Sequence, residues 1–233
     1  MAPLIRSTVI ALLSSAVAGH GGIWNYSIAG DWRPGFFPYY PAEGQHSIQR
    51  HWIDFSPIVD TTSPALVCNN PGDYAEEYAT IDAGAEIQAY YPGWPHDIGA
   101  VVVWMAYCGP DAGACSSFNG TGRHWFKIDE AGLLSGGMRE GLWAQGKLIA
   151  NNNTWAVTVP ETLRGGAYLM RHELVALHVP FKPEFYPECA HLYVVGSGDE
   201  VPGEEYLASI PGVWEDDGKE LLVHAGVGGE HLC

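Results

Sequence analysis

Turn-forming residues divide this chain into short apolar segments, and this division constrains the fold more than any other feature. The 233 residues include 29 glycines and 16 prolines, spread along the chain. Between them lie short runs rich in β-branched and aromatic residues and bounded by Gly, Pro, Asn or Asp. These runs are residues 85–91, 100–107, 154–160, 166–178 and 191–198. Helical periodicity is absent, so the sequence predicts an all-β fold: an immunoglobulin-like or fibronectin-type-III-like antiparallel β-sandwich with long loops.

The first nineteen residues have the pattern of a secretory leader. Arg6 precedes an apolar run over residues 8–13, which continues through small residues to Gly19. The run is too short to cross a bilayer. We therefore expect a signal peptide over residues 1–19 and an extracellular, secreted product. No linker, repeat or low-complexity segment divides the remainder, so residues 20–233 are predicted to form a single β-sandwich catalytic domain.

The charge balance bears on the partners of the chain. The formal net charge is −16, with only 11 Lys and Arg residues. Nucleic acid and anionic membranes are therefore poor partners. An acidic surface rich in aromatic residues suits a neutral partner such as a polysaccharide. We expect a monomer.

Five cysteines in an exported chain are expected mostly to pair. Cys108 and Cys115 enclose a Gly/Pro/Ala loop that a disulfide would close. Cys68 and Cys189 are the natural remaining pair, and their long loop would contribute about 4 kcal/mol to stability. Cys233, the last residue, is left over. Glycosylation sequons stand at Asn25, Asn119 and Asn152.

Histidines carry the clearest chemical signal. Gly-x-Ser-x-Gly, His-Glu-x-x-His and phosphate-loop motifs are absent, whereas ten histidines stand against eleven Lys and Arg residues. If the leader is removed after Gly19, His20 offers its α-amine and ring nitrogen to one metal. A further imidazole then completes a three-nitrogen site of the kind that favours copper. Cleavage after Ala18 fits the local rules slightly better, but it leaves Gly19 in place and removes this chelate.

Three motifs between Trp143 and Gly198 carry a family resemblance: KLIANN, YLMRHE and FYPEC. They closely resemble the secreted fungal copper-dependent lytic polysaccharide monooxygenases of auxiliary activity family nine, formerly glycoside hydrolase family sixty-one. In that family the motif runs from a Lys-Leu-Ile-x-Asn-Asn strand through Tyr-Leu-x-Arg-His-Glu to Gln-x-Tyr-Pro-x-Cys. HGGIW at residues 20–24 is similar to the family's N-terminal histidine segment. GAVVVWMA at residues 99–106 is similar to the strand that follows its second copper ligand.

The resemblance implies oxidative cleavage of the glycosidic bonds of cellulose or a related β-glucan. It implies one copper ion as cofactor, dioxygen or hydrogen peroxide as co-substrate, and an external electron donor, either a small reductant or a redox partner. His20 becomes the amine-and-ring chelator and Tyr186 the buried axial tyrosine. His178 becomes the residue that positions bound oxygen species. Glu184 stands where the family has a glutamine near that tyrosine, and a carboxylate there adds negative charge or donates a proton.

The second copper ligand departs from the family pattern. The family places this histidine two residues before a Gly-Pro, a position that Asp97 occupies here, with His96 one residue earlier and Ala100 in place of the proline. Either His96 reaches the metal or Asp97 supplies a carboxylate ligand. The displaced histidine also leaves an alternative function open: a copper- or polysaccharide-binding protein on the same fold with little or no oxidative turnover. A plain structural protein without metal leaves His20, His178 and Tyr186 unexplained.

Aromatic rings stack on sugars, and six aromatic residues are candidates for this contact. They are foremost Trp24, Tyr39 and Trp214, with Trp32, Tyr40 and Trp94 in addition. His172 belongs to the Arg-His-Glu motif and is expected to be a packed, hydrogen-bonded core residue. The remaining histidines are expected at the surface or in loops: His46, His51, His124, His191, His224 and His231.

Overall fold

The computed structural model describes residues 21–214. The predicted signal peptide (1–19), His20, His224, His231 and Cys233 lie outside the described residues. Within residues 21–214, no helix combines the length and the apolarity that a membrane span needs.

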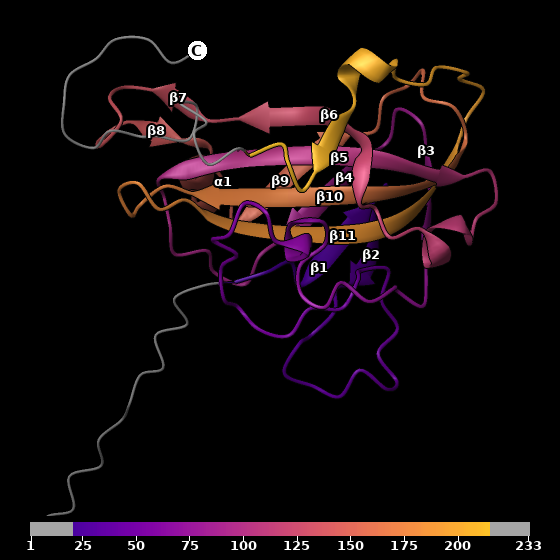
Figure 1. Ribbon diagram of the computed structural model, residues 1–233, viewed down its shortest axis with the longest axis horizontal. Coiled ribbons are helices and arrows are strands. Elements are labelled where there is room, and N and C mark those ends of the chain that lie inside the picture. Colours follow the sequence, from indigo (N-terminus) through magenta and orange to yellow (C-terminus); the bar gives the residue numbers. More distant parts are fainter. Residues whose placement is uncertain (1–20, 215–233) are drawn as a thin grey trace, which may run out of the picture.

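Two packed sheets confirm the predicted β-sandwich (Figure 1). The four-stranded sheet has the order β2 (Asp31–Pro34), β1 (Asn25–Ile28), β4 (Glu86–Tyr90) and β9 (Thr154–Thr158). The six-stranded sheet has the order β12 (Ala208–Ile210), β6 (Gly122–Ala131), β5 (Gly99–Gly109), β10 (Gly166–Ala176), β11 (Glu184–Val195) and β3 (Ala79–Asp82). Neighbouring strands are antiparallel except for β11 and β3, which run parallel.

Short elements complete the chain. A small hairpin pairs β7 (Leu133–Ser135) with β8 (Leu142–Trp143), and three single 3-10 turns are η1 (Pro64–Leu66), η2 (Ala114–Ser117) and η3 (Glu204–Tyr206). The helix α1 (Ala144–Ala150) corrects the expectation of a Lys-Leu-Ile-x-Asn-Asn strand. Ala144 and Leu148, one helical turn apart, are both fully buried. A short helix can bury this pair on one face, whereas the segment is too brief to show a helical period in the sequence.

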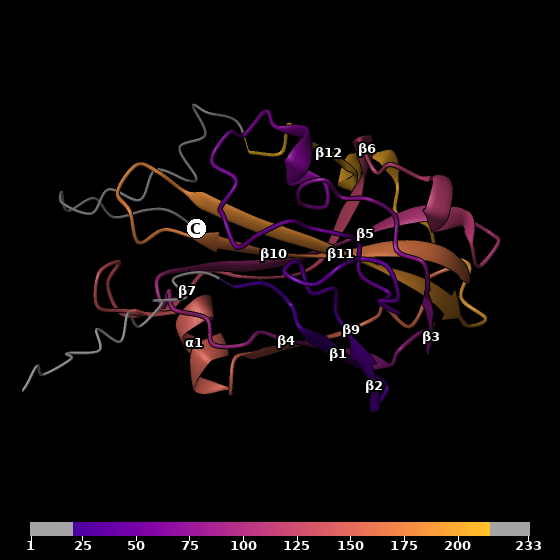
Figure 2. The same cartoon turned by 90° about the horizontal axis from the view of Figure 1, so that it is seen from below.

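Alternation along β10 separates two hydrophobic clusters. Met170 and Leu174 face the space between the sheets, whereas Leu169 and Val175 face the opposite side of the six-stranded sheet. That opposite side is covered by the segment that contains η1, which Figure 2 shows above β10 and β11, while β1, β4 and β9 lie below. Because both faces are covered, every residue of β10 is buried.

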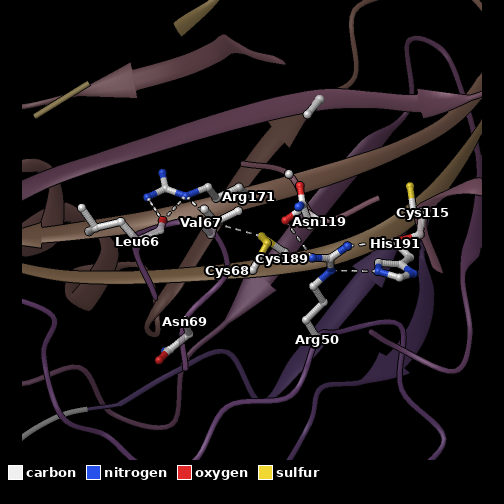
Figure 3. The surroundings of a disulfide bond; sticks show 12 residues. Arg50, Leu66, Val67, Cys68, Asn69, Cys115, Asn119, Arg171, Cys189 and His191 are labelled. Carbon is white, nitrogen blue, oxygen red and sulfur yellow. Dashed lines mark hydrogen bonds between the residues drawn. A yellow bond between two sulfur atoms is a disulfide. The ribbon is translucent and has the colours of Figure 1, made fainter. Parts of the chain in front are cut away.

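The long segment over residues 28–70 is held against β11 by backbone hydrogen bonds and a disulfide. Arg50 donates its backbone N–H to the Cys189 carbonyl, and Ile58 and Phe185 exchange N–H···O=C hydrogen bonds. Both expected disulfides, Cys68–Cys189 and Cys108–Cys115, are confirmed. Figure 3 shows the first, which joins the chain just after η1 to β11.

The buried Arg171 on β10 also binds the segment over residues 28–70. It donates hydrogen bonds to the carbonyls of Leu66 and Val67, as Figure 3 shows, and forms an ion pair with Glu173 at 2.6 Å.

Strand register brings three loops to one end of the sandwich. Gly99, the first residue of β5, pairs with Ala176, the last of β10, and Ala176 in turn pairs with Glu184, the first of β11. The residues just before β5, just after β10 and at the start of β11 therefore lie at the same end of the six-stranded sheet, at the left in Figure 1.

Candidate metal centre

Three metal-ligating side chains meet at this end of the sandwich. Ligand atoms of His96, His178 and Glu184 all lie within 4.8 Å of one another. The two imidazole rings are stacked, with 3.8 Å between their centroids and 8° between their planes. His178 Nε2 lies 3.8 Å from Glu184 Oε2. The strand ends position all three residues, because His96 precedes β5, His178 follows β10 and Glu184 begins β11.

Tyr186 lies beside this cluster on the same face of β11 as Glu184. Its hydroxyl donates a 2.8 Å hydrogen bond to Glu184 Oε2. Burial, with this hydrogen bond and the charge of Glu184, raises the pKa of Tyr186 well above its usual 10. The phenol is therefore a neutral donor at physiological pH.

Trp94 packs against both His96 and Tyr186. It is buried, which corrects the expectation of an exposed ring that stacks on sugar. It is 3% exposed, and its ring meets Tyr186 edge-on at 4.9 Å and His96 edge-on at 5.4 Å. Its indole N–H donates to Gln145 Oε1 at 3.0 Å, and the Gln145 amide donates to the Ala100 carbonyl. Helix α1 thus fixes the loop that carries His96. Gln145 was missed in the sequence because a lone polar residue before an apolar run gives no signal.

The structure brings His96, and not Asp97, into the cluster. Asp97 is exposed and lies against helix α1, where its Cβ is 3.8 Å from the position that a Cβ on Gly146 would take. Residues 92–97 form no strand. A one-residue shift in a loop need not reverse the direction of a side chain, as it would in a strand. The displaced histidine is therefore compatible with a metal site.

The N-terminal segment approaches the cluster beside Trp94. A Cβ added to Gly21, the first described residue, would lie 3.8–3.9 Å from atoms of Pro92 and Trp94. Two residues later, Ile23 donates its backbone N–H to Glu188 Oε2 at 2.6 Å. His20 itself lies outside the described residues.

Glu188 is a fully buried carboxylate that the sequence did not single out. Burial raises its pKa to about 8, although the hydrogen bonds from Ile23 and Gln49 oppose the rise. Burial and, second, the charge of Glu188 raise the pKa of Tyr26 and of Tyr91.

The donor set fits a transition metal better than calcium or magnesium. Two imidazoles lie together with one carboxylate and a neighbouring phenol. Imidazole nitrogens suit copper, zinc, iron and nickel, whereas the alkaline-earth ions prefer sites made of oxygen ligands alone.

Two other histidines differ from the expectations. His172 is fully buried as expected, but neither ring nitrogen has a hydrogen-bond partner among the described residues, and burial lowers its pKa to about 4. His191 lies 3% exposed on β11 instead of at the surface. Arg50 Nε donates to His191 Nε2 at 3.1 Å, as Figure 3 shows, and burial together with this charge lowers the pKa of His191 to about 3. His46 and His124 are exposed, and His51 lies in a loop.

The candidate sugar-binding aromatics fall into two groups. Trp24 and Tyr39 are exposed, at 36% and 63%, and so are Trp32 and Tyr40. Trp214 is half-buried against Phe185, and its indole N–H donates to both oxygens of Glu173 at 3.2 Å. Its place in the packing of the six-stranded sheet accounts for Trp214 without a sugar.

The glycosylation sequons occupy different environments. Asn119 and Asn152 are exposed in loops, whereas Asn25 is half-buried within β1. Their glycosylation stays a prediction.

Residues 20–227 match the sequence model of Auxiliary Activity family 9 (formerly GH61). The chain belongs to this family. The expected resemblance is thereby confirmed, and oxidative, copper-dependent cleavage of polysaccharides is the general function of the family.

Two relatives of known sequence illustrate how far the similarity extends. The chain is 42% identical over 230 residues to AA9 family lytic polysaccharide monooxygenase B of Heterobasidion irregulare, covering 97% of this chain and 92% of the relative. It is 41% identical over 210 residues to AA9 family lytic polysaccharide monooxygenase D of Thermothelomyces thermophilus, covering 87% and 80%.

Solved structures share the fold. The crystal structure of HiLPMO9B superposes with a TM-score of 0.81 at 42% identity, over 87% of this chain and 90% of that one. A cellulose-active polysaccharide monooxygenase from M. thermophila superposes with a TM-score of 0.80 at 38% identity, over 87% and 90%. Both likenesses support the β-sandwich of a lytic polysaccharide monooxygenase.

Proposed function

We propose that this protein is a secreted copper-dependent monooxygenase that cleaves the glycosidic bonds of cellulose or a related β-glucan. One observation carries the proposal: His96, His178, Glu184 and Tyr186 are grouped at one end of a sandwich of this family. A similar structure is that of a cellulose-active enzyme, which supports cellulose as the substrate. Export through the leader at residues 1–19 brings the protein to that insoluble polymer.

Copper would be held by the α-amine and ring of His20 and by the ring of His96. The approach of Gly21 to Trp94, whose ring also touches His96, supports this arrangement. Tyr186, hydrogen-bonded to Glu184 of the same cluster, is a neutral phenol and adds no charge. A copper ion bound there supplies one-electron chemistry toward dioxygen or hydrogen peroxide, with electrons from an external donor.

The remaining polar groups handle protons and orientation. His178 Nε2 and Glu184 Oε2 are 3.8 Å apart, close enough for the carboxylate to orient the ring and for a proton to pass with a small movement. Glu184 also fixes the Tyr186 hydroxyl. With peroxide, one oxygen atom enters a C–H bond beside the glycosidic oxygen and the other leaves as water. The hydroxylated carbon then releases the neighbouring sugar.

Trp24 and Tyr39 are the residues we propose for contact with the glucan. Both present exposed rings, and sugar rings stack on such faces. The strongly acidic chain suits this neutral polymer.

A second function has a specific observation in its favour. His96, His178 and Glu184 alone supply three ligand atoms within 4.8 Å. These three residues can therefore bind copper without the N-terminal amine, in a geometry that need not support turnover. Copper capture with little oxidation is the alternative.

Product analysis separates the two functions. Cellulose is incubated with the protein beginning at His20, copper, a reductant and hydrogen peroxide, and the soluble sugars are analysed by mass spectrometry. Oxidised oligosaccharides that require both copper and reductant support the enzyme. Tight copper binding without such products supports capture.

A further inference from the structure

Glu188 ties strand β11 to the N-terminal segment. It lies on β11 between Tyr186 and Ala190, and alternation along the strand turns its side chain to their face, toward the space between the two sheets. One carboxylate oxygen, Oε2, accepts hydrogen bonds from the Ile23 backbone N–H at 2.6 Å and the Gln49 amide at 2.5 Å. Gln49 Oε1 in turn accepts the Phe36 backbone N–H at 2.7 Å. Strand β11, the N-terminal segment and the loop that carries Gln49 thus meet at one buried carboxylate.

The fit around this carboxylate leaves no room for a side chain at Gly22. A Cβ there would lie 2.0 Å from Glu188 Oε1 and 2.7 Å from the Trp52 ring. The backbone of the N-terminal segment therefore passes directly over the carboxylate and the indole. Only glycine allows this approach.

Stability does not account for a carboxylate at this position. Glu188 is 3% exposed and has no ion-pair partner among the described residues. Burying a carboxyl group costs free energy, and an apolar side chain of similar volume is often neutral or stabilising in such a place. The hydrogen bond to Ile23 is the feature that an apolar residue cannot supply.

We propose that Glu188 is a positioning residue for the metal centre, which holds Ile23 so that the amine and ring of His20 approach His96 and Tyr186. The inference rests on the proposed function, because it assigns a role to the segment that leads to His20. Tyr186 and Glu188 alternate on one face of β11, so the same strand carries the phenol beside the metal and the acceptor that fixes the N-terminal segment. Through Gln49 the long loop over residues 28–70 joins the same contact.

The test compares Glu188→Leu with Glu188→Gln in the protein that begins at His20. Glu188→Leu removes the acceptor, whereas Glu188→Gln keeps one oxygen for Ile23. Amide hydrogen exchange of residues 21–25 is measured in the copper-free protein, copper affinity by calorimetry, and the copper coordination by electron paramagnetic resonance. Glu86→Gln, at an exposed position on β4, is the control for a general change of charge.

We expect Glu188→Leu to speed exchange of the Ile23 amide at least tenfold and to weaken copper binding by roughly 10- to 100-fold, the usual cost of losing a supporting residue. The paramagnetic spectrum should change as well. Glu188→Gln should stay close to the parent in both exchange and copper affinity, and Glu86→Gln should change neither. Gln49→Leu, which changes a different segment, should shift copper affinity in the same direction by a smaller factor, and it serves if Glu188→Leu does not fold.

Two results overturn the inference. One is unchanged exchange of the Ile23 amide in Glu188→Leu, or in Gln49→Leu if Glu188→Leu does not fold. The other is faster exchange with copper affinity and spectrum within twofold of the parent. Failure of the proposed function looks different, since the parent protein itself would then lack tight copper binding or oxidised products while the exchange result still stands.

Discussion

The ring of His96 lies parallel to the ring of His178, with 3.8 Å between centroids, although one precedes β5 and the other follows β10. The contact exists because Gly99 and Ala176 are paired in register, which places the two loops together. Asp97, the next residue, is exposed beside helix α1. His96 and Asp97 can therefore be compared directly as candidate ligands.

Replacing His96 by alanine should weaken copper binding far more than replacing Asp97. We expect His96→Ala to exceed the roughly 10- to 100-fold loss typical of a supporting residue. Asp97→Ala should stay within about threefold of the parent, since its carboxylate lies outside the cluster. Calorimetric titration of copper into both variants measures this. A larger loss in Asp97→Ala would identify the carboxylate as the ligand.

Glu184→Gln should raise the copper reduction potential. A negative charge near copper stabilises Cu(II) over Cu(I), and the amide removes that charge while its oxygen still accepts the Tyr186 hydroxyl. Redox titration of the copper-loaded variant measures the shift. Glu86→Gln, at an exposed position on β4, is the control for a general change of charge. Equal potentials in Glu184→Gln and the parent would contradict an effect of this carboxylate on the metal.

Stability should fall as the pH drops below about 6.5, in part because of two buried histidines. In the fold the pKa of His172 is about 4 and that of His191 about 3, both lowered first by burial. A histidine with a lowered pKa stabilises the fold fully above its unfolded value of about 6.5, and this contribution is lost as the pH falls toward the folded value. Each histidine should cost about 2 kcal/mol between pH 7.5 and 4.5.

Denaturant unfolding at both pH values measures this change in the parent and in His191→Gln. The glutamine oxygen can still accept from Arg50 but takes up no proton in this range. The variant should therefore lose less stability on acidification than the parent. An equal loss in both proteins would assign the acid sensitivity to other groups.

Removing the Cys68–Cys189 disulfide should destabilise the protein more than removing Cys108–Cys115. The sequence separations are 121 and 7 residues, so the long loop restricts the unfolded chain more. On the chain-entropy model the paired alanine variants should lose about 4 and about 2 kcal/mol of unfolding free energy. Chemical denaturation of each double variant decides the order. The reverse order would mean that the short disulfide holds native structure that the long one does not.

The five runs predicted as strands correspond to β4, β5, β9, β10 and the second half of β11, but the other strands, among them the ten-residue β6, and the first half of β11 were missed. Segments with β-branched and aromatic residues, such as 100–107, became strands near their expected bounds. The first half of β11 contains Glu184, Pro187 and Glu188, residues that are unfavourable in strands, so no strand pattern was visible there. These glutamates are buried because tertiary contacts outweigh local preference.

The candidate site was recognised through the family resemblance and the residue types, and not through its geometry. A histidine displaced by one position gave no sign of its direction, because that depends on whether the segment is a strand or a loop. His191 was expected at the surface because nothing near it in the sequence indicated a buried partner. That partner, Arg50, is 141 residues away. Contacts between such distant segments are set by strand register and packing, which a single sequence does not state.

Copper titration of two forms of the protein tests the central claim, that the N-terminal histidine completes the metal centre. One form begins at His20 and the other retains Gly19 before it. We predict one copper per chain, bound to the first form more tightly than to the second by over roughly 100-fold, because only the first offers the amine and the ring together. Equal affinity in the two forms would contradict the account and would leave His96, His178 and Glu184 as a metal site of their own.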